Sequence, residues 1–171
     1  LPDATIFEET IFDFPTIKSR MREMAFLTKG IKINLFDKRE GQEKEQHFHY
    51  EGGIREYVEY LNENKITLYP EIIYCEGQKD SVYVEVAMQH NDTYIEGCYS
   101  FVNNITTPEG GTHYTGFKNA ITKTFNTYAK QMKFIKDTDA PLSGEDIREG
   151  LSAIISIKLP EPQFEGQTKQ K

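Results

Sequence analysis

The feature that most constrains the fold is the alternation of apolar and polar residues from Val82 to Gln89. Such alternation is typical of a β-strand that buries one face and leaves the other wetter. Residues 72–74 and 94–102 are also rich in β-branched and aromatic residues, and turn-forming residues separate them from the central run at 77–80 and 91–92. We therefore expect three strands that form an antiparallel meander.

Helical periodicity and helix-ending residues surround this predicted sheet. Asp13 before Pro15 opens a helix that Gly30 closes, after a loosely alternating stretch at 5–12 that we expect to be a strand. Residues 31–35 alternate as a strand, 37–45 read as a hairpin tip, and a second helix follows Gly53. The longest apolar stripe runs from Phe117 to Met132, and its width suits packing on a sheet.

The last third of the chain completes an α+β pattern. Residues 143–146 resemble a capping box for a short helix, and Leu151 to Lys158 read as a final apolar strand before an exposed tail. The sequence therefore predicts a mostly antiparallel sheet with its helices gathered on one face.

Composition limits the functional classes. The length of 171 residues suits one domain. The net charge of -7 argues against a free-standing nucleic-acid binder, whose surface should be basic. No apolar run approaches the ~18 residues of a membrane span, and no signal peptide is evident. The two cysteines, Cys75 and Cys98, have no metal-ligand spacing, which fits a reducing compartment. We expect buried thiols on neighbouring strands rather than a disulfide.

Several side-chain groups could carry chemistry, and each has a simpler interpretation. His47 and His49 share one side of a strand and could bind a metal, although no third ligand is evident. Glycines at 110 and 111 before a helix could present amides to an anion, but the phosphate-loop lysine is missing. The carboxylates Glu145, Asp146 and Glu149 could act as acid and base or as solvated helix-cap charges. Glycosylation-like triplets also occur at Asn91 and Asn104.

The tail offers one further candidate, Lys169, which follows Gly166, Gln167 and Thr168. A lysine on an exposed loop suits a phosphate oxygen as a point charge, and a neighbouring glutamine can orient the loop. Spacing alone makes this a weak signal.

Longer runs carry a specific resemblance. Residues 109–113 (EGGTH), 142–151 (LSGEDIREGL) and 162–169 (PQFEGQTK) resemble the second domain of the B subunit of bacterial type IIA DNA topoisomerases. Residues 48–53 (FHYEGG) and 101–105 (FVNNI) look like the same family, and the resemblance extends from about Phe12 to Lys171. Residues 162–164 and the Gly52-Gly53 pair are more similar to the gyrase branch than to topoisomerase IV.

The resemblance implies a transducer domain over residues 13–171, preceded at 1–12 by a trailing segment of a GHKL-type ATPase domain. The implied fold is that of the second domain of ribosomal protein S5, with a four-stranded sheet and a left-handed βαβ crossover. The chain would be cut from a longer subunit in which a metal-binding domain follows. That subunit would work in the bacterial cytoplasm, associated with the nucleoid and with no membrane partner.

The resemblance also implies a site. Lys169 would contact the terminal phosphate of ATP held by the preceding domain, and Gln167 would orient the loop or bind phosphate beside it. ATP and Mg²⁺ would belong to the full-length subunit, and the isolated chain would bind and hydrolyse no ATP. Implied partners are the gyrase A protein, a second copy of the gyrase B protein and double-stranded DNA. The DNA could be met by lysines of the long helix, which could equally form a solvated helix face: Lys118, Lys123, Lys130 and Lys133.

Three alternatives stay open at this point. The chain could belong to topoisomerase IV and serve decatenation. It could be a stand-alone α+β module whose tail lysine captures an anion. It could also be a small enzyme that uses the carboxylates at 145, 146 and 149.

Overall fold

The computed structural model describes residues 2–136 and 138–171, which divide into two compact units, Leu1–Glu56 and Tyr57–Lys171. The expected boundary between residues 12 and 13 concerns a domain outside this chain and stays a prediction. No helix among the described residues is long and apolar enough to cross a membrane.

The first unit consists of a helix and a two-stranded hairpin. Helix α1 (Phe14–Leu27) begins at Asp13, whose carboxylate accepts from the Thr16 amide at 2.9 Å. Strands β1 (Lys32–Asp37) and β2 (Lys44–His49) pair antiparallel, which confirms the predicted hairpin. Residues 2–12 form neither strand nor helix, so the strand expected at 5–12 is wrong.

Arg39 fastens the hairpin tip to the start of α1. Its Nη1 donates to the Phe12 carbonyl at 3.0 Å, and its Nε donates to Asp37 Oδ1 at 2.9 Å. The hydrogen bonds from Arg39 hold the pKa of the Asp37 carboxyl below its usual value.

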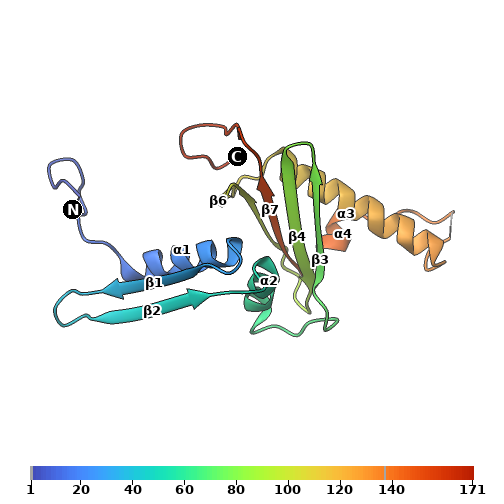
Figure 1. Cartoon of the computed structure of the whole chain (residues 1–171). Coiled ribbons are helices and arrows are strands. Elements are labelled where there is room, and N and C mark those ends of the chain that lie inside the picture. Colours follow the sequence, from blue (N-terminus) through green and yellow to red (C-terminus); the bar gives the residue numbers. More distant parts are fainter. Residues whose placement is uncertain (1, 137) are drawn as a thin grey trace. The chain divides into compact units, whose positions relative to one another are not determined.

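Helix α2 (Ile54–Asn62) begins in the first unit and ends in the second. The second unit contains β3 (Ile73–Lys79), β4 (Val82–His90), β5 (Gly97–Val102), β6 (Ile105–Thr106), α3 (Thr112–Gln131), α4 (Gly144–Arg148) and β7 (Leu151–Lys158). Its strands form one sheet in the order β3-β4-β7-β5-β6 (Figure 1).

The sheet is mixed, and the predicted meander is wrong beyond β3 and β4. Strand β7 inserts between β4 and β5, pairing antiparallel with the first and parallel with the second. The two-residue β6 adds a fifth strand to the four expected. Residues 151–156 of β7 are all buried, as is usual for a central strand that is covered on both faces.

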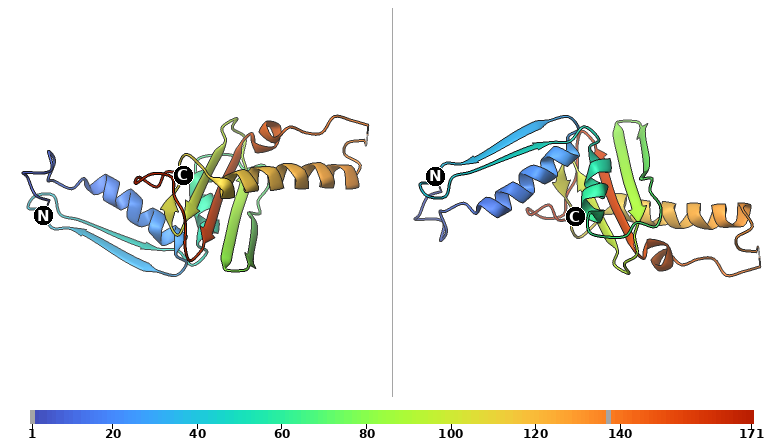
Figure 2. Two further views of the ribbon diagram at one scale, coloured as in Figure 1. Left: turned by 90° about the horizontal axis from the view of Figure 1, so that it is seen from above. Right: turned by 90° about the horizontal axis from the view of Figure 1, so that it is seen from below.

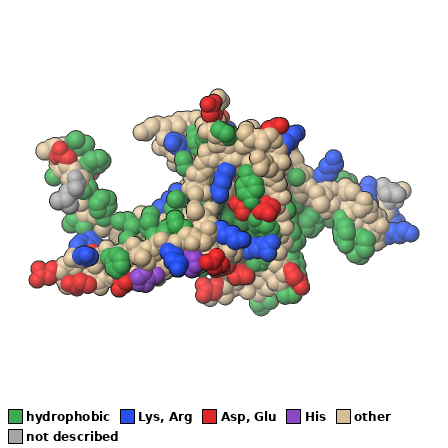
Figure 3. Space-filling model, viewed as in Figure 1, with side chains coloured by type: hydrophobic (Ala, Val, Ile, Leu, Met, Phe, Trp, Pro, Cys, Tyr) green, Lys and Arg blue, Asp and Glu red, His purple; other side chains and the backbone are tan. Residues whose placement is uncertain are grey.

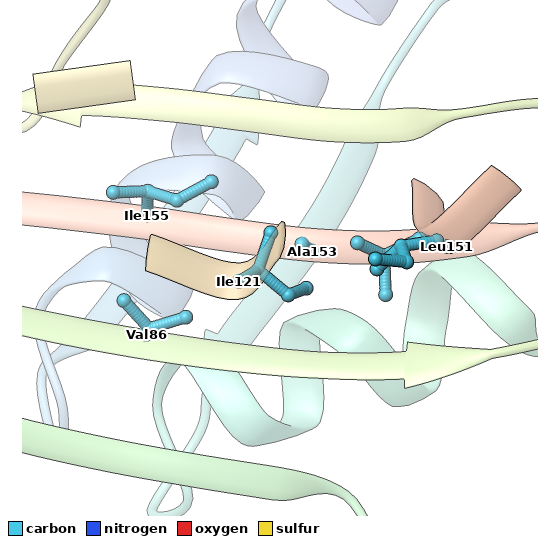
Figure 4. Close-up of a cluster of buried hydrophobic side chains, with 6 residues drawn as sticks. Val86, Ile121, Leu151, Ala153 and Ile155 are labelled. Carbon is cyan, nitrogen blue, oxygen red and sulfur yellow. The ribbon is translucent and has the colours of Figure 1, made fainter. Parts of the chain in front are cut away.

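Helix α3 covers one face of this sheet. Ile121 packs against Val86 of β4 and against Leu151, Ala153 and Ile155 of β7 (Figure 4). The buried Ile147 of α4 joins the same cluster. Both views in Figure 2 show α3 running past the edge of the sheet. The predicted apolar stripe is not buried along its whole length, because Tyr128 is 55% and Met132 51% exposed.

The opposite face of the sheet meets the end of α2. The Asn62 side chain donates to Gln89 Oε1 at 3.0 Å and accepts from Ser152 Oγ at 2.7 Å. Gln89 and Ser152 point away from α3, because they alternate with Met88 and with Leu151 and Ala153 along their strands. The expectation of helices on one face is therefore wrong. Strands β5 and β7 with α3 between them form a βαβ unit.

Candidate functional site

The loop that carries Gln167 and Lys169 follows β7, and residues 159–171 contain no helix or strand. Gly166 has φ +69° and Lys169 has φ +56°, so the chain turns sharply on both sides of Gln167. Lys169 is a non-glycine residue in the left-handed region, which crowds its Cβ. Its backbone is therefore held by neighbouring contacts.

Two backbone hydrogen bonds supply those contacts. The Glu165 amide donates to the Lys171 carbonyl at 2.7 Å and closes the loop on itself. The Glu109 amide donates to the Gln170 carbonyl at 3.0 Å and ties the loop to the turn before α3. Lys171 Nζ also lies 3.4 Å from Glu165 Oε2.

The side chains of Gln167 and Lys169 are both exposed. Lys169 Nζ lies 5.5 Å from the centroid of the Phe164 ring, within the range of a cation–π contact. Among residues 2–136 and 138–171, no carboxylate lies within ion-pair distance of Lys169. Its ammonium group can therefore meet an anion without breaking an internal ion pair.

The glycine pair before α3 lies beside this loop. Gly111 is the N-cap residue and offers no side-chain cap, and a cavity of about 540 Å³ is lined by residues 108–112, by Lys118 and by Lys171. A Cβ on Gly111 would lie 2.9 Å from the His113 ring. A side chain at Gly111 would clash with His113, so this glycine is explained by the start of α3 without any bound anion.

One of the three carboxylates near α4 caps that helix, and the other two are exposed. Asp146 accepts from the Ser143 amide at 3.2 Å and from its hydroxyl at 2.7 Å, which completes the predicted capping box. Glu145 and Glu149 are exposed. The helix-cap interpretation is the one that the geometry supports.

The paired histidines of β2 bond to their own hairpin. His47 contacts Asn34 Oδ1 at 2.7 Å and Glu45 Oε1 at 2.7 Å, and His49 contacts the Ile31 carbonyl at 3.0 Å. No group of three or more His, Cys, Asp or Glu side chains in the described part of the chain could hold a metal ion. The Mg²⁺ implied for the full-length subunit stays a prediction.

The two other histidines, His90 and His113, both have hydrogen-bond partners. His90 donates from Nε2 to the Ile147 carbonyl at 2.8 Å, so its Nδ1 accepts from Tyr69 at 2.8 Å. His113 Nε2 lies 3.0 Å from Thr107 Oγ1, and burial lowers the pKa of this imidazole.

The two cysteines lie on strands that are not neighbours. Cys75 is on β3 and Cys98 on β5, with β4 and β7 between them, so the expectation of neighbouring strands is wrong. Three strand spacings of about 4.8 Å put a disulfide out of reach. Cys75 is exposed rather than buried, whereas burial raises the pKa of the Cys98 thiol to about 12.

A buried polar network on the α2 side of the sheet was missed from the sequence. Asn91 Nδ2 donates to Asn62 Oδ1 and to Ser152 Oγ, both at 3.2 Å, and Asn91 Oδ1 accepts from the Thr93 hydroxyl at 2.6 Å. Asn91 is 2% exposed, so its glycosylation-like triplet is not available for modification. That triplet was the only signal, and it pointed to the wrong chemistry.

The four lysines proposed for DNA contact do not share one surface. Lys123 and Lys130 lie on the same side of α3, whereas Lys118 is about a third of a turn away. Lys118 Nζ also lies 4.8 Å from the Tyr114 ring centroid. Lys133 follows the helix with φ +59°. Figure 3 shows basic side chains near the end of α3 and mixed charges over the sheet.

Comparison with known proteins gives one consistent result. A model of the DNA gyrase B family matches residues 53–171. The DNA gyrase B protein of Clostridium acetobutylicum is 57% identical over 171 residues, covering 99% of this chain and 26% of the relative. That of Enterococcus faecalis is 52% identical and covers 100% of this chain and 27% of the relative. The chain thus spans about a quarter of the length of these curated relatives.

Solved structures agree. The 43K ATPase domain of Thermus thermophilus gyrase B, in complex with an aminocoumarin, matches with a TM-score of 0.82 and 38% identity over 96% of this chain and 44% of that one. The ATP-binding domain of Francisella tularensis topoisomerase IV, in complex with a small-molecule inhibitor, matches with a TM-score of 0.77 and 25% identity over 99% of this chain and 44% of that one. Because the family model matches most of this chain and the relatives are more than half identical to it, this chain belongs to the DNA gyrase B family.

Proposed function

We propose that the chain is the transducer domain of a gyrase B ATPase subunit, in which Lys169 contacts the terminal phosphate of ATP bound by a preceding domain. The proposal includes the fold of the second domain of ribosomal protein S5 with a left-handed crossover. The observation that carries it is the state of Lys169, whose backbone is held while its ammonium is exposed and has no carboxylate partner among the described residues.

The chemistry of such a contact is direct. Phosphoryl transfer needs positive charge on the γ-phosphate oxygens, and a lysine from a second domain makes that charge depend on how the domains are arranged. Loss of the γ-phosphate removes the partner of the lysine and releases the domains to move. ATP turnover would then drive the movement of a DNA gate during supercoiling, together with the gyrase A protein and a second copy of gyrase B.

The test compares three variants of the full-length subunit. Lys169→Ala should lower ATP turnover by about two orders of magnitude, which is the typical effect of removing one preorganised charge-stabilising group. Gln167→Ala should lower it less. Lys171→Ala is the matched control, because it removes a lysine two residues away that pairs with Glu165, and turnover should stay near the parent value. Supercoiling should fall in step with turnover.

Unchanged turnover in a folded Lys169→Ala protein would sink the phosphate contact and favour an anion-binding module instead. The isolated chain should show no ATP binding by calorimetry, and micromolar binding would contradict the assignment. Decatenation in place of supercoiling, when the full-length protein is combined with its partner protein, would favour the topoisomerase IV alternative.

DNA contact is a subordinate proposal, and it now concerns Lys123 and Lys130, the pair on one side of α3. Replacing both with glutamine should weaken duplex binding at low salt and reduce its salt dependence by about one unit of slope per lost phosphate contact. Lys118→Gln is the control from another side of the helix. Equal losses in both variants would contradict a DNA-contacting surface formed by Lys123 and Lys130.

A further inference from the structure

The loop around Lys169 is fastened to the rest of the second unit by backbone atoms. The Gln170 carbonyl, one residue beyond the lysine, accepts from the Glu109 amide at 3.0 Å. Lys169 itself has φ +56°, a conformation that persists only where the surroundings enforce it. The hydrogen bond from the Glu109 amide therefore joins this loop to the turn before α3.

The turn that supplies this amide is itself firmly placed. The Gly110 amide donates to the Thr107 carbonyl at 2.9 Å, and Thr107 is 2% exposed. The Thr107 hydroxyl donates to the Ser100 carbonyl of β5 at 3.0 Å and lies 3.0 Å from His113 Nε2 in the first turn of α3. The turn is therefore joined to the sheet on one side and to the long helix on the other.

We propose that the turn from Pro108 to Gly111 positions Lys169, with the Glu109 amide holding the Gln170 carbonyl and so fixing the backbone of the lysine against the start of α3. This inference rests on the proposed function of Lys169. Glu109 touches no substrate in this arrangement and acts through Lys169 alone. Because the two segments are bonded to each other, a phosphate that limits the motion of Lys169 also limits the motion of the turn before α3.

A proline at position 109 removes the amide donor, whereas an alanine keeps it. In the full-length subunit, Glu109→Pro should lower ATP turnover about three- to tenfold, which is the usual effect of losing one hydrogen bond. Glu109→Ala should turn over ATP like the parent. Circular dichroism and thermal melting of each variant establish that the comparison is made between folded proteins.

A double-mutant cycle separates positioning from general damage. In a Lys169→Ala background, Glu109→Pro should cost little more, because the proline acts through a lysine that is no longer present. An undiminished loss in that background, or equal losses for Glu109→Pro and Glu109→Ala, would overturn the inference.

A measurement on the unmodified full-length protein covers the case in which the proline variant fails to fold. A non-hydrolysable ATP analogue should slow hydrogen exchange in peptides covering both 105–111 and 162–171. Slowing confined to 162–171 would overturn the positioning inference and leave the phosphate contact intact. If Lys169→Ala leaves turnover unchanged, the proposed function itself fails.

Discussion

The two faces of the five-stranded sheet differ in how many buried polar side chains they carry. The face under α3 is apolar, and a cavity of about 530 Å³ lies between α3 and the strands. The face that meets the end of α2 carries the polar network of Asn62, Gln89, Asn91 and Ser152, in which each side chain has a partner. Apolar contact is non-directional, whereas hydrogen bonds demand one geometry. Both faces bury apolar side chains, because Ala87 and Ile154 on the α2 side are fully buried. The α2 face differs in adding directional hydrogen bonds that specify one placement of α2.

The largest effect is expected on the apolar face. Leu151→Ala should lower the free energy of unfolding by about 2–5 kcal/mol, because Leu151 is fully buried in the cluster and its removal leaves a cavity. Ile155→Val is a graded control with an expected loss of about 0.5–1.5 kcal/mol. Chemical denaturation measures both, and equal losses would contradict the tight packing of Leu151.

Substitutions in the polar network should lower the free energy of unfolding by less than Leu151→Ala does. Asn62→Ala should cost about 1–3 kcal/mol, because Gln89 Oε1 loses its donor and the Ser152 hydroxyl and Asn91 Nδ2 each lose an acceptor. Asn119→Ala, at an exposed position of α3, should change stability by no more than about 0.5 kcal/mol. A cost for Asn62→Ala as small as that for Asn119→Ala would remove the distinction between the two faces.

The cavity under α3 predicts an effect of opposite sign. Ala120 is exposed at the wall of this cavity, so the larger side chain of Ala120→Leu can cover part of its apolar lining. We expect a gain of about 0.5–2 kcal/mol in the free energy of unfolding, as is common for cavity filling. Thr115→Leu, on the polar side of the helix, should bring no gain. Destabilisation by Ala120→Leu would show that this space cannot accept a side chain.

The smallest effect concerns pH. Burial lowers the pKa of His113 from its ordinary 6.5, so the unfolded chain takes up a proton more readily than the folded one. The contribution of His113 to stability is therefore present above pH 6.5 and declines as the pH falls toward its folded pKa. Thermal melts at neutral and mildly acidic pH should show a smaller drop for His113→Gln than for the parent. An identical drop would assign the pH dependence to other groups.

Local structure was predictable wherever one residue type dictates a backbone choice. Asp13 caps α1 and Ser143 with Asp146 caps α4, because side chains that accept from nearby amides act within a few residues. The alternation from Val82 to Gln89 likewise identified β4, but its prediction of one wetter face is wrong, because Ala87 and Gln89 on the α2 side are also buried. The resemblance supplied Lys169, because the match rests on side-chain identity along the tail.

Only the tertiary structure decided which strands pair and where the lysine loop is fastened. Alternation states which residues share a face but not which strands are neighbours, so the insertion of β7 between β4 and β5 was missed, and with it the separation of Cys75 from Cys98. Asn91 found its partners on α2 and β7, far away in sequence. The hydrogen bond from Glu109 to Gln170 joins backbone atoms that every residue except proline possesses. It could therefore not be predicted from the side chains in the sequence.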